Sequence, residues 1–200
     1  MREPFRDFVG REIAPDSVLI TCGLPATNKT ETAEVIAALK GMALLRTDAL
    51  RLEVLKGRDI FDEGTASDMS LRTLVYDRLF SEAEILARTG TGVILDATFI
   101  TGDLRRRAAG VARRNGRILV IEETAAPEAF SLEKISRRSR ESYESNALTP
   151  QAYFYNRDRF EPVDIADLKD REPGLVVMHF VVDTASDSGD GWFVVSRSGD

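Results

Sequence analysis

One stretch near the start of the chain decides the fold: Ser17-Val-Leu-Ile-Thr-Cys-Gly-Leu-Pro-Ala-Thr-Asn-Lys-Thr-Glu-Thr-Ala33. The mostly apolar run Val18–Cys22 is typical of a buried strand, and the apolar spacing over Thr32–Leu39 predicts a helix. Between them, Gly23-Leu-Pro-Ala-Thr-Asn-Lys-Thr30 has the G-x-x-x-x-G-K-T spacing of a phosphate-binding loop, except that its second glycine is Asn28. The stretch therefore predicts a strand, a phosphate-binding turn and a helix.

The chemistry of such a loop assigns roles to its residues. Successive backbone N–H groups and the helix N-terminus would close around a β-phosphate. Lys29 would reach the β- and γ-phosphates, and the Thr30 hydroxyl would contact a bound Mg²⁺. The residues expected to contact a nucleotide are Gly23, Leu24, Pro25, Ala26, Thr27, Asn28, Lys29 and Thr30.

Asn28 leaves two interpretations of the loop open. Asparagine visits positive φ more readily than most residues with a side chain, so the loop could keep its shape. Its side chain could also hinder the close approach of a phosphate. The short motif by itself is equally compatible with an ordinary strand-turn-helix corner, but the buried strand before it and the helix after it favour phosphate binding. We expect Asn28→Gly to tighten nucleotide binding.

Length and composition indicate one globular domain over residues 1–200, with a core at about 17–183 and a tail at 184–200. The chain is 43% hydrophobic and 30% charged, and it has no apolar run of signal-peptide or membrane-spanning length. We therefore expect a cytoplasmic protein with no membrane partner. Its one cysteine, Cys22, excludes an internal disulfide; a small buried hydrophobe is favoured over a reactive thiol.

The net charge of −6 does not favour a chain built to wrap nucleic acid. Arginines nevertheless gather at Arg105–Arg107, Arg113–Arg117 and Arg137–Arg140. Arginine can bind phosphate through two hydrogen bonds at once, but such clusters are also common on solvated helix faces. Both interpretations stay open, with solvated faces favoured for residues 105–117.

Strands and helices alternate along the chain, which predicts an α/β fold with a parallel sheet and helices on both faces. Before the first strand we expect only a short amphipathic turn around Phe5, Phe8 and Val9. Further strands are expected over Gly41–Arg46, Val93–Phe99, Gly116–Ile121 and Leu175–Asp183, and an added edge strand over Trp192–Ser196. Helices are expected over Met69–Thr89, Thr101–Asn115 and Pro127–Arg140, with a short one around Tyr153–Tyr155.

Two aspartates stand where strands end, which is where ligands bind in open α/β sheets. Asp48 follows the strand at 41–46 and could be a helix N-cap, an active-site acid, or both. Asp96 ends the hydrophobic strand at 93–96 in the pattern of a Walker B acid, which holds Mg²⁺ directly or through water.

Taken together, these segments resemble the AAA_33 group of P-loop kinases, which includes relatives of polynucleotide 5′-hydroxyl kinase, zeta-toxin and chloramphenicol phosphotransferase. The resemblance implies a three-layer P-loop NTPase fold and transfer of a phosphate from ATP, with Mg²⁺, to a hydroxyl group. The pieces that carry it are Gly23–Thr30, Thr47–Arg51, Val93–Phe99, and a late segment with Arg137-Arg138, Ser145–Ala147, Tyr153 and Arg159–Val163.

The resemblance also implies roles for single residues. Asp48 would take the proton from the acceptor hydroxyl, and Arg51 would position the acceptor. Asp96 would be the Walker B acid. Arg137 or Arg138 would be a lid arginine that closes over the phosphates, adding charge and excluding water.

Three residues depart from the family pattern: Asn28, Glu31 in the first helical turn, and Asn146 in the late segment. They motivate an alternative, a non-catalytic nucleotide-binding or regulatory module with a degenerate loop. For a kinase, the net charge favours a small-molecule or nucleotide-like acceptor, and a nucleic-acid end is a third possibility.

Overall fold

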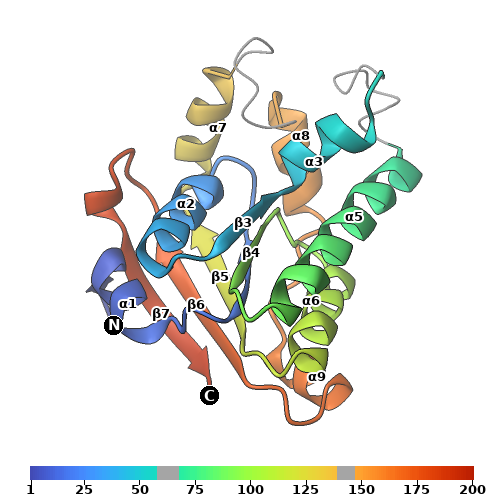
Figure 1. Cartoon of the computed structure of the whole chain (residues 1–200). Helices are drawn as coiled ribbons and strands as arrows, with labels where there is room; N and C mark the ends of the chain where they lie inside the picture. The colour runs from blue at the N-terminus through green and yellow to red at the C-terminus, as the bar shows by residue number, and fades with distance from the viewer. Residues whose placement is uncertain (58–67, 139–146) are drawn as a thin grey trace.

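The sheet is built from segments spread over the whole chain. A computed structural model describes residues 1–57, 68–138 and 147–200, and in these residues seven strands form a single sheet (Figure 1). The strands are β1 (Glu3–Pro4), β2 (Val18–Cys22), β3 (Ala43–Arg46), β4 (Val93–Asp96), β5 (Leu119–Ala125), β6 (Val177–Asp183) and β7 (Phe193–Gly199). Their order across the sheet is β1-β7-β6-β5-β2-β4-β3.

The strand that leads into the phosphate loop lies inside the sheet. β2 pairs in parallel with β4 on one side and β5 on the other, so that Val18 lies opposite both Val93 and Leu119. β3 and β6 extend the parallel block, and β7 and β1 follow as antiparallel strands. The predicted, mostly parallel sheet is confirmed. The added strand near the C-terminus is present as β7, but it is not at the edge because the two-residue β1 pairs with its outer side.

Helices cover both faces of the sheet, as predicted. They are α1 (Phe5–Glu12), α2 (Lys29–Lys40), α3 (Thr47–Val54), α5 (Met69–Arg88), α6 (Gly102–Arg114), α7 (Glu128–Ser136), α8 (Pro150–Arg157) and α9 (Ile165–Arg171), with a 3₁₀ turn at Gly189–Gly191. One face carries α1 and α2, and the other carries α5, α6 and α9. Helices α3, α7 and α8 gather beyond the carboxyl ends of the parallel strands (Figure 1).

Several element boundaries differ from those expected. β5 begins at Leu119 and continues to Ala125, so Glu122 and Glu123 lie within it and not after it. Pairing with β2 and β6 on both sides extends the hydrogen-bonded ladder through these charged positions. The helix expected over Pro127–Arg140 ends at Ser136. Residues 139–140 and Asn146 lie outside the described residues, and α9 was not expected.

Two apolar clusters form the core, one on each face of the sheet. The N-terminal segment is a full helix and not a single turn, because Phe5, Phe8 and Val9 all pack into the cluster on the α2 face. The rings of Phe8 and Phe180 lie 4.9 Å apart between centroids, and Trp192 joins the same cluster. Both ends of the chain thus contribute to the core. No helix in the described residues combines the length and apolar character needed to cross a membrane.

Candidate active site

The phosphate loop joins β2 to α2 with the backbone shape that its sequence predicts. Asn28 occupies the N-cap of α2 at φ 59° and ψ 25°, the left-handed conformation in which asparagine is tolerated. Gly23 has φ 137°, and a Cβ there would lie 2.6 Å from the carbonyl oxygen of Thr124. Only glycine fits at that position, because the loop passes so close to β5.

The Asn28 side chain is bound to protein groups on two other segments. Its amide nitrogen donates to the backbone oxygens of Thr184 and Ser186, at 3.0 and 3.1 Å, and its oxygen accepts a hydrogen bond from Lys134 on α7. The Thr184 hydroxyl in turn donates to the Thr27 oxygen at 3.0 Å. The residue that replaces the glycine therefore ties the loop to the segment that follows β6.

Lys134 also accounts for the second departure from the family pattern. Its ammonium group pairs with Glu31 as well as with Asn28. Burial opposes ionisation of Glu31, but the hydrogen bond and charge of Lys134 hold its pKa below the usual value. A carboxylate beside the phosphate end of α2 is thereby neutralised before any anion binds. Local sequence does not predict this role for Lys134, because α7 and the loop meet only in the folded chain.

Lys29 is buried, and no carboxylate of the described residues forms an ion pair with its ammonium group. It is 9% exposed, and its ammonium donates to the Leu24 oxygen and lies 3.4 Å from the Thr27 hydroxyl. Burial lowers the pKa of Lys29 to about 8, and the negative charge of Asp96 partly offsets this effect. A phosphate entering the loop would supply the negative charge that this cation lacks.

Thr30 and Asp96 meet at the end of β4. The Thr30 hydroxyl donates to one carboxylate oxygen of Asp96 at 2.7 Å, and the Thr21 hydroxyl donates to the other at 3.1 Å. Hydroxyl and carboxylate oxygens are the hard donors that Mg²⁺ prefers, so the pair fits this ion. The described residues contain no group of three or more His, Cys, Asp or Glu that could hold a metal alone. An ion here would need further ligands from water or phosphate.

Asp48 is the second residue of α3, whose N-cap position belongs to Arg46. Of the alternatives left open for Asp48, the N-cap is therefore excluded. Burial raises the pKa of Asp48 above its ordinary value, and Asp96 adds to this effect, while Arg51, Arg46 and Arg138 oppose it. A carboxylate with a raised pKa is a stronger proton acceptor than an exposed one.

One pocket of about 590 Å³ brings most of these side chains together. Of the predicted residues, its lining includes Pro25, Ala26, Asn28, Lys29, Thr30, Asp48, Arg51, Asp96 and Arg138. Gly23, Leu24 and Thr27 are not among the lining residues and shape the turn from behind, where the Thr27 hydroxyl donates to the Leu24 oxygen at 2.8 Å. The two candidate lid arginines separate: Arg138 lines the pocket and donates to the Ala147 oxygen at 3.0 Å, whereas Arg137 pairs with Glu133 on the surface.

The pocket lining also holds residues outside the quoted motifs, from α5 and α8: Arg72, Tyr76, Gln151, Tyr155 and Asn156. Thr47 and Thr98 line it too, and they lie within the quoted motifs but had no role assigned to them. The helical pattern of α5 and α8 shows which residues face the core, but it does not show which polar residues face a cavity.

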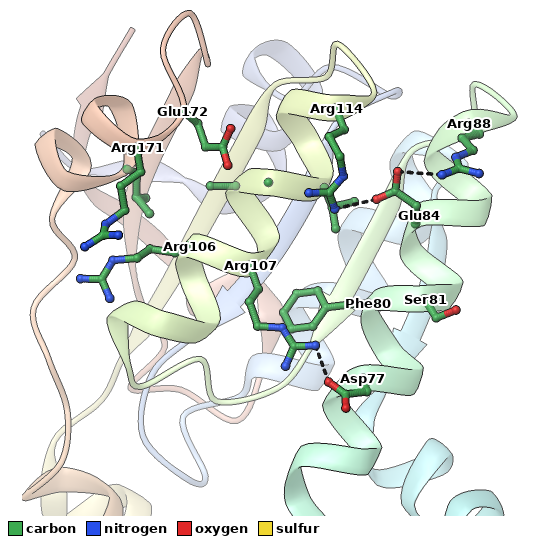
Figure 2. A pocket seen from close by; sticks show the side chains of 14 residues that line it. Asp77, Phe80, Ser81, Glu84, Arg88, Arg106, Arg107, Arg114, Arg171 and Glu172 are labelled. Carbon is green, nitrogen blue, oxygen red and sulfur yellow. Dashed lines mark hydrogen bonds and ion pairs between the residues drawn. The ribbon is translucent and has the colours of Figure 1, made fainter.

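The arginine-rich helix α6 lies beside a different hollow, a groove of about 880 Å³ between α5, α6 and α9. Figure 2 shows Arg107 reaching Asp77, and Arg114 and Arg88 on either side of Glu84, with N–O distances of 2.6, 2.9 and 3.4 Å. These arginines are paired surface residues, as the favoured interpretation predicts.

Arg105 fits neither interpretation of the arginine cluster. It is 2% exposed, and its guanidinium donates to the backbone oxygens of Phe99, Glu161 and Pro162 at 3.0, 2.8 and 2.9 Å. Nearby Cys22 is fully buried, and burial raises the pKa of its thiol to about 11, in line with a core residue and not a reactive thiol.

The family of the chain follows from comparison with known sequences. Residues 18–163 match the model of the AAA_33 family, described as an AAA domain. The chain belongs to the AAA_33 family. The match begins with β2 and ends just before α9, so it contains the phosphate loop, Asp48, Asp96 and α8. No curated protein gives a significant match to the sequence.

Solved structures with low sequence identity share the fold of this AAA_33 chain. A kinase candidate from Chloroflexus aurantiacus J-10-fl is 22% identical over 84% of this chain and 88% of its own, with a TM-score of 0.60. A gluconokinase from Sinorhizobium meliloti 1021 is 14% identical, with coverages of 87% and 86% and a TM-score of 0.58. Chaetomium thermophilum Kti12 in complex with ADP-AlF3 is 15% identical, with coverages of 86% and 92% and a TM-score of 0.62. These likenesses establish the P-loop NTPase fold.

Proposed function

We propose that this AAA_33 protein is a P-loop kinase that transfers the γ-phosphate of ATP to a hydroxyl group of a small-molecule or nucleotide-like acceptor. The observation that carries the proposal is the shared pocket. A phosphate loop with its buried Lys29, an oxygen pair suited to Mg²⁺ and a buried carboxylate at Asp48 all face one cavity. Phosphoryl transfer requires this combination, because its catalysis depends mainly on alignment and charge neutralisation.

Each group has a distinct task in the proposed reaction. Asp48 accepts the proton from the acceptor hydroxyl, whose oxygen forms a bond to the γ-phosphorus while the bond to the β–γ bridging oxygen breaks and ADP leaves. Lys29 and Arg138 offset the negative charge on the phosphates. Thr30 and Asp96 would hold Mg²⁺, which when bound supplies further positive charge to the β- and γ-phosphates.

Thermal unfolding tests the nucleotide half of the proposal. A ligand that binds only the folded state raises the melting temperature by mass action. We expect millimolar Mg-ATP to raise it, and Mg-GTP measured in parallel identifies the donor. If neither nucleotide raises it, the loop does not bind a triphosphate and the kinase assignment is wrong.

The Asp48→Asn variant tests the chemical half. It should retain the Mg-ATP-induced rise in melting temperature but lose about 100- to 10,000-fold in ADP release with acceptor present. Asp77→Asn, which removes a surface carboxylate paired with Arg107, is the matched control and should keep full activity. Nucleotide binding without any phosphoryl transfer in the parent protein would favour the alternative, a non-catalytic nucleotide-binding module.

A further inference from the structure

Among the described residues, four cations line the pocket: Lys29, Arg51, Arg72 and Arg138. In the proposed kinase Lys29 and Arg138 face the donor phosphates. Arg51 lies one helical turn beyond Asp48, and its charge lowers the pKa of that carboxyl. The family resemblance implies that Arg51 positions the acceptor, so Arg72 is the one of these four cations to which no role has been assigned.

Arg72 lies near the N-terminus of α5, an end of the helix where the dipole does not favour a cation. The carboxylate at this end is that of the N-cap residue Asp68, which accepts hydrogen bonds from the backbone N–H groups of Ser70 and Leu71. Within residues 1–57, 68–138 and 147–200, no carboxylate pairs with the Arg72 guanidinium. A half-buried arginine that faces a cavity and is not paired with one of the carboxylates there is suited to bind an anionic group of a ligand.

The positions of Arg72 and Asp48 indicate which chemical groups a bound acceptor would carry. Helices α3 and α5 pack against each other (Figure 1). Asp48 on α3 and Arg72 on α5 line the same cavity. A single small molecule could present a hydroxyl to Asp48 and an anionic group to Arg72.

The part of the pocket lining that α8 contributes is polar. It includes Gln151 and Asn156, and the Asn156 amide nitrogen donates to the Ala152 oxygen at 2.6 Å, which leaves the side-chain oxygen available as an acceptor. Tyr76 and Thr98 also line the pocket, and each carries a hydroxyl group. Such a lining suits further hydroxyl groups on the ligand, and the volume of about 590 Å³ is that of a small-molecule site.

We infer that the acceptor is a small hydroxylated acid, a polyol or sugar that carries a carboxylate or phosphate, and that Arg72 binds its anionic group. The inference rests on the proposed kinase function. It makes Arg72 a specificity-determining residue that contacts the acceptor and not the nucleotide.

The test measures acceptor turnover by the full chain with saturating Mg-ATP on matched neutral and anionic compounds: glucose with gluconate and glucose 6-phosphate, glycerol with glycerate, ribose with ribose 5-phosphate, and adenosine with 3′-AMP. We expect an anionic member to be the best acceptor, with a KM about 10- to 100-fold below that of its neutral partner, as one charge-assisted contact provides. The carboxylate and phosphate arms identify which anion is bound.

Arg72→Met should remove this preference by raising the KM of the anionic acceptor about 10- to 100-fold while kcat changes less than about threefold. Arg72→Lys, which keeps the charge, should restore part of the preference. Arg78→Met is the matched control, because Arg78 lies on the same helix but pairs with Glu82 on the surface. The Mg-ATP-induced rise in melting temperature should be the same in all three variants.

Several outcomes would overturn the inference. One is a neutral compound, or an oligonucleotide with a 5′-hydroxyl, as the best acceptor. Another is an Arg72→Met variant that retains the preference for the anion. The inference would also be overturned if none of the anionic compounds is phosphorylated, even when Mg-ATP binds. The proposed function fails separately, when Mg-ATP does not raise the melting temperature or when no acceptor of any kind is phosphorylated.

Discussion

The two hollows of this protein both contain arginines, but they treat charge in opposite ways. In the groove of α5, α6 and α9 the labelled guanidinium groups of Arg88, Arg107 and Arg114 each meet a carboxylate (Figure 2). In the pocket above the parallel strands, Lys29 is hydrogen-bonded to a backbone oxygen and Arg72 has no carboxylate partner among the described residues. The labelled arginines of the larger hollow are paired with carboxylates, whereas the smaller hollow holds two cations, Lys29 and Arg72, that the proposed function assigns to anionic groups of its ligands. Pairing, more than the number of arginines, distinguishes a binding site from a solvated surface.

Two glutamates show the same contrast. Burial opposes ionisation of Glu84 in the groove, but hydrogen bonds from Arg114, Asn115 and Arg88 hold its pKa below the usual value. Glu122 lies on β5 beneath the phosphate loop, and neither of its carboxylate oxygens finds a hydrogen-bond partner among the described residues. The nearby Thr32 hydroxyl donates to the Lys29 oxygen at 2.9 Å. Burial therefore raises the pKa of Glu122 to about 8, with Asp96 adding to the effect.

The largest effect that would sharpen this contrast is expected from Lys29→Met. The variant should lose at least about 100-fold in Mg-ATP affinity, measured by calorimetry, because a charge-assisted contact in a water-excluded site is removed. Its melting temperature without nucleotide should rise, because the buried ammonium disfavours the folded state at pH 7. Lys40→Met, at the exposed end of the same helix, should leave affinity unchanged. If Lys29→Met retained its Mg-ATP affinity, the phosphate loop would not be part of the nucleotide-binding site.

The next largest effect is the pH dependence caused by Glu122. Below pH 4.5 the carboxyl is protonated in both states; between 4.5 and about 8 only the unfolded chain releases the proton, so stability falls as pH rises. Glu122→Gln should remove a slope of up to about 1.4 kcal/mol per pH unit, seen as a urea-midpoint gain that is larger at pH 8 than at pH 5. Glu84→Gln should behave oppositely and destabilise the protein at pH 7, with the difference shrinking as pH falls. A pH-independent gain in Glu122→Gln would mean that Glu122 is ionised in the folded protein.

A smaller effect is expected from Asn28→Gly, and it reverses the expectation from sequence. Glycine keeps the left-handed backbone but loses the hydrogen bonds to Thr184, Ser186 and Lys134. We expect the free energy of unfolding to fall by about 1–3 kcal/mol and Mg-ATP affinity not to improve. Chemical denaturation and calorimetry on the same samples separate the two effects. Tighter binding in this variant would show that the Asn28 side chain obstructs the phosphate.

The smallest effect should come from the groove. Arg107→Gln breaks a surface pair with Asp77 and a contact with the Phe80 ring at 4.3 Å, so we expect less than about 1 kcal/mol of lost stability and unchanged kcat/KM. The parent protein should also show no salt-sensitive binding to single-stranded DNA. Binding that weakens steeply with salt, and further in Arg107→Gln, would instead make this groove a nucleic-acid interface.

Much of this protein could be predicted because its key features are local. Asparagine is one of the few residues with a side chain that tolerate the left-handed conformation, and Asn28 adopts it. Val18–Cys22 forms an interior strand because it is almost wholly apolar. The position of Asp96 at the end of β4 follows from the same reasoning. The motif spacing also placed Lys29, Asp48 and Asp96 at one edge of the sheet, since parallel strands end there together.

Predictions failed or were missing where a residue's role depends on a distant partner. The end of β5 was misplaced because pairing with two neighbouring strands outweighs the polarity of Glu122 and Glu123. Local sequence could not separate Arg137 from Arg138, since the two are adjacent and only the fold turns Arg138 into the pocket.

The sequence alone determined the strand-loop-helix unit, the mostly parallel sheet and the family, because periodicity and motif spacing are properties of neighbouring residues. Only the tertiary structure decided how Asn28 is held, that Lys134 neutralises Glu31, and that Arg72 faces the pocket without a carboxylate partner among the described residues. The physical reason is that burial and charge pairing depend on distances in space between segments far apart along the chain.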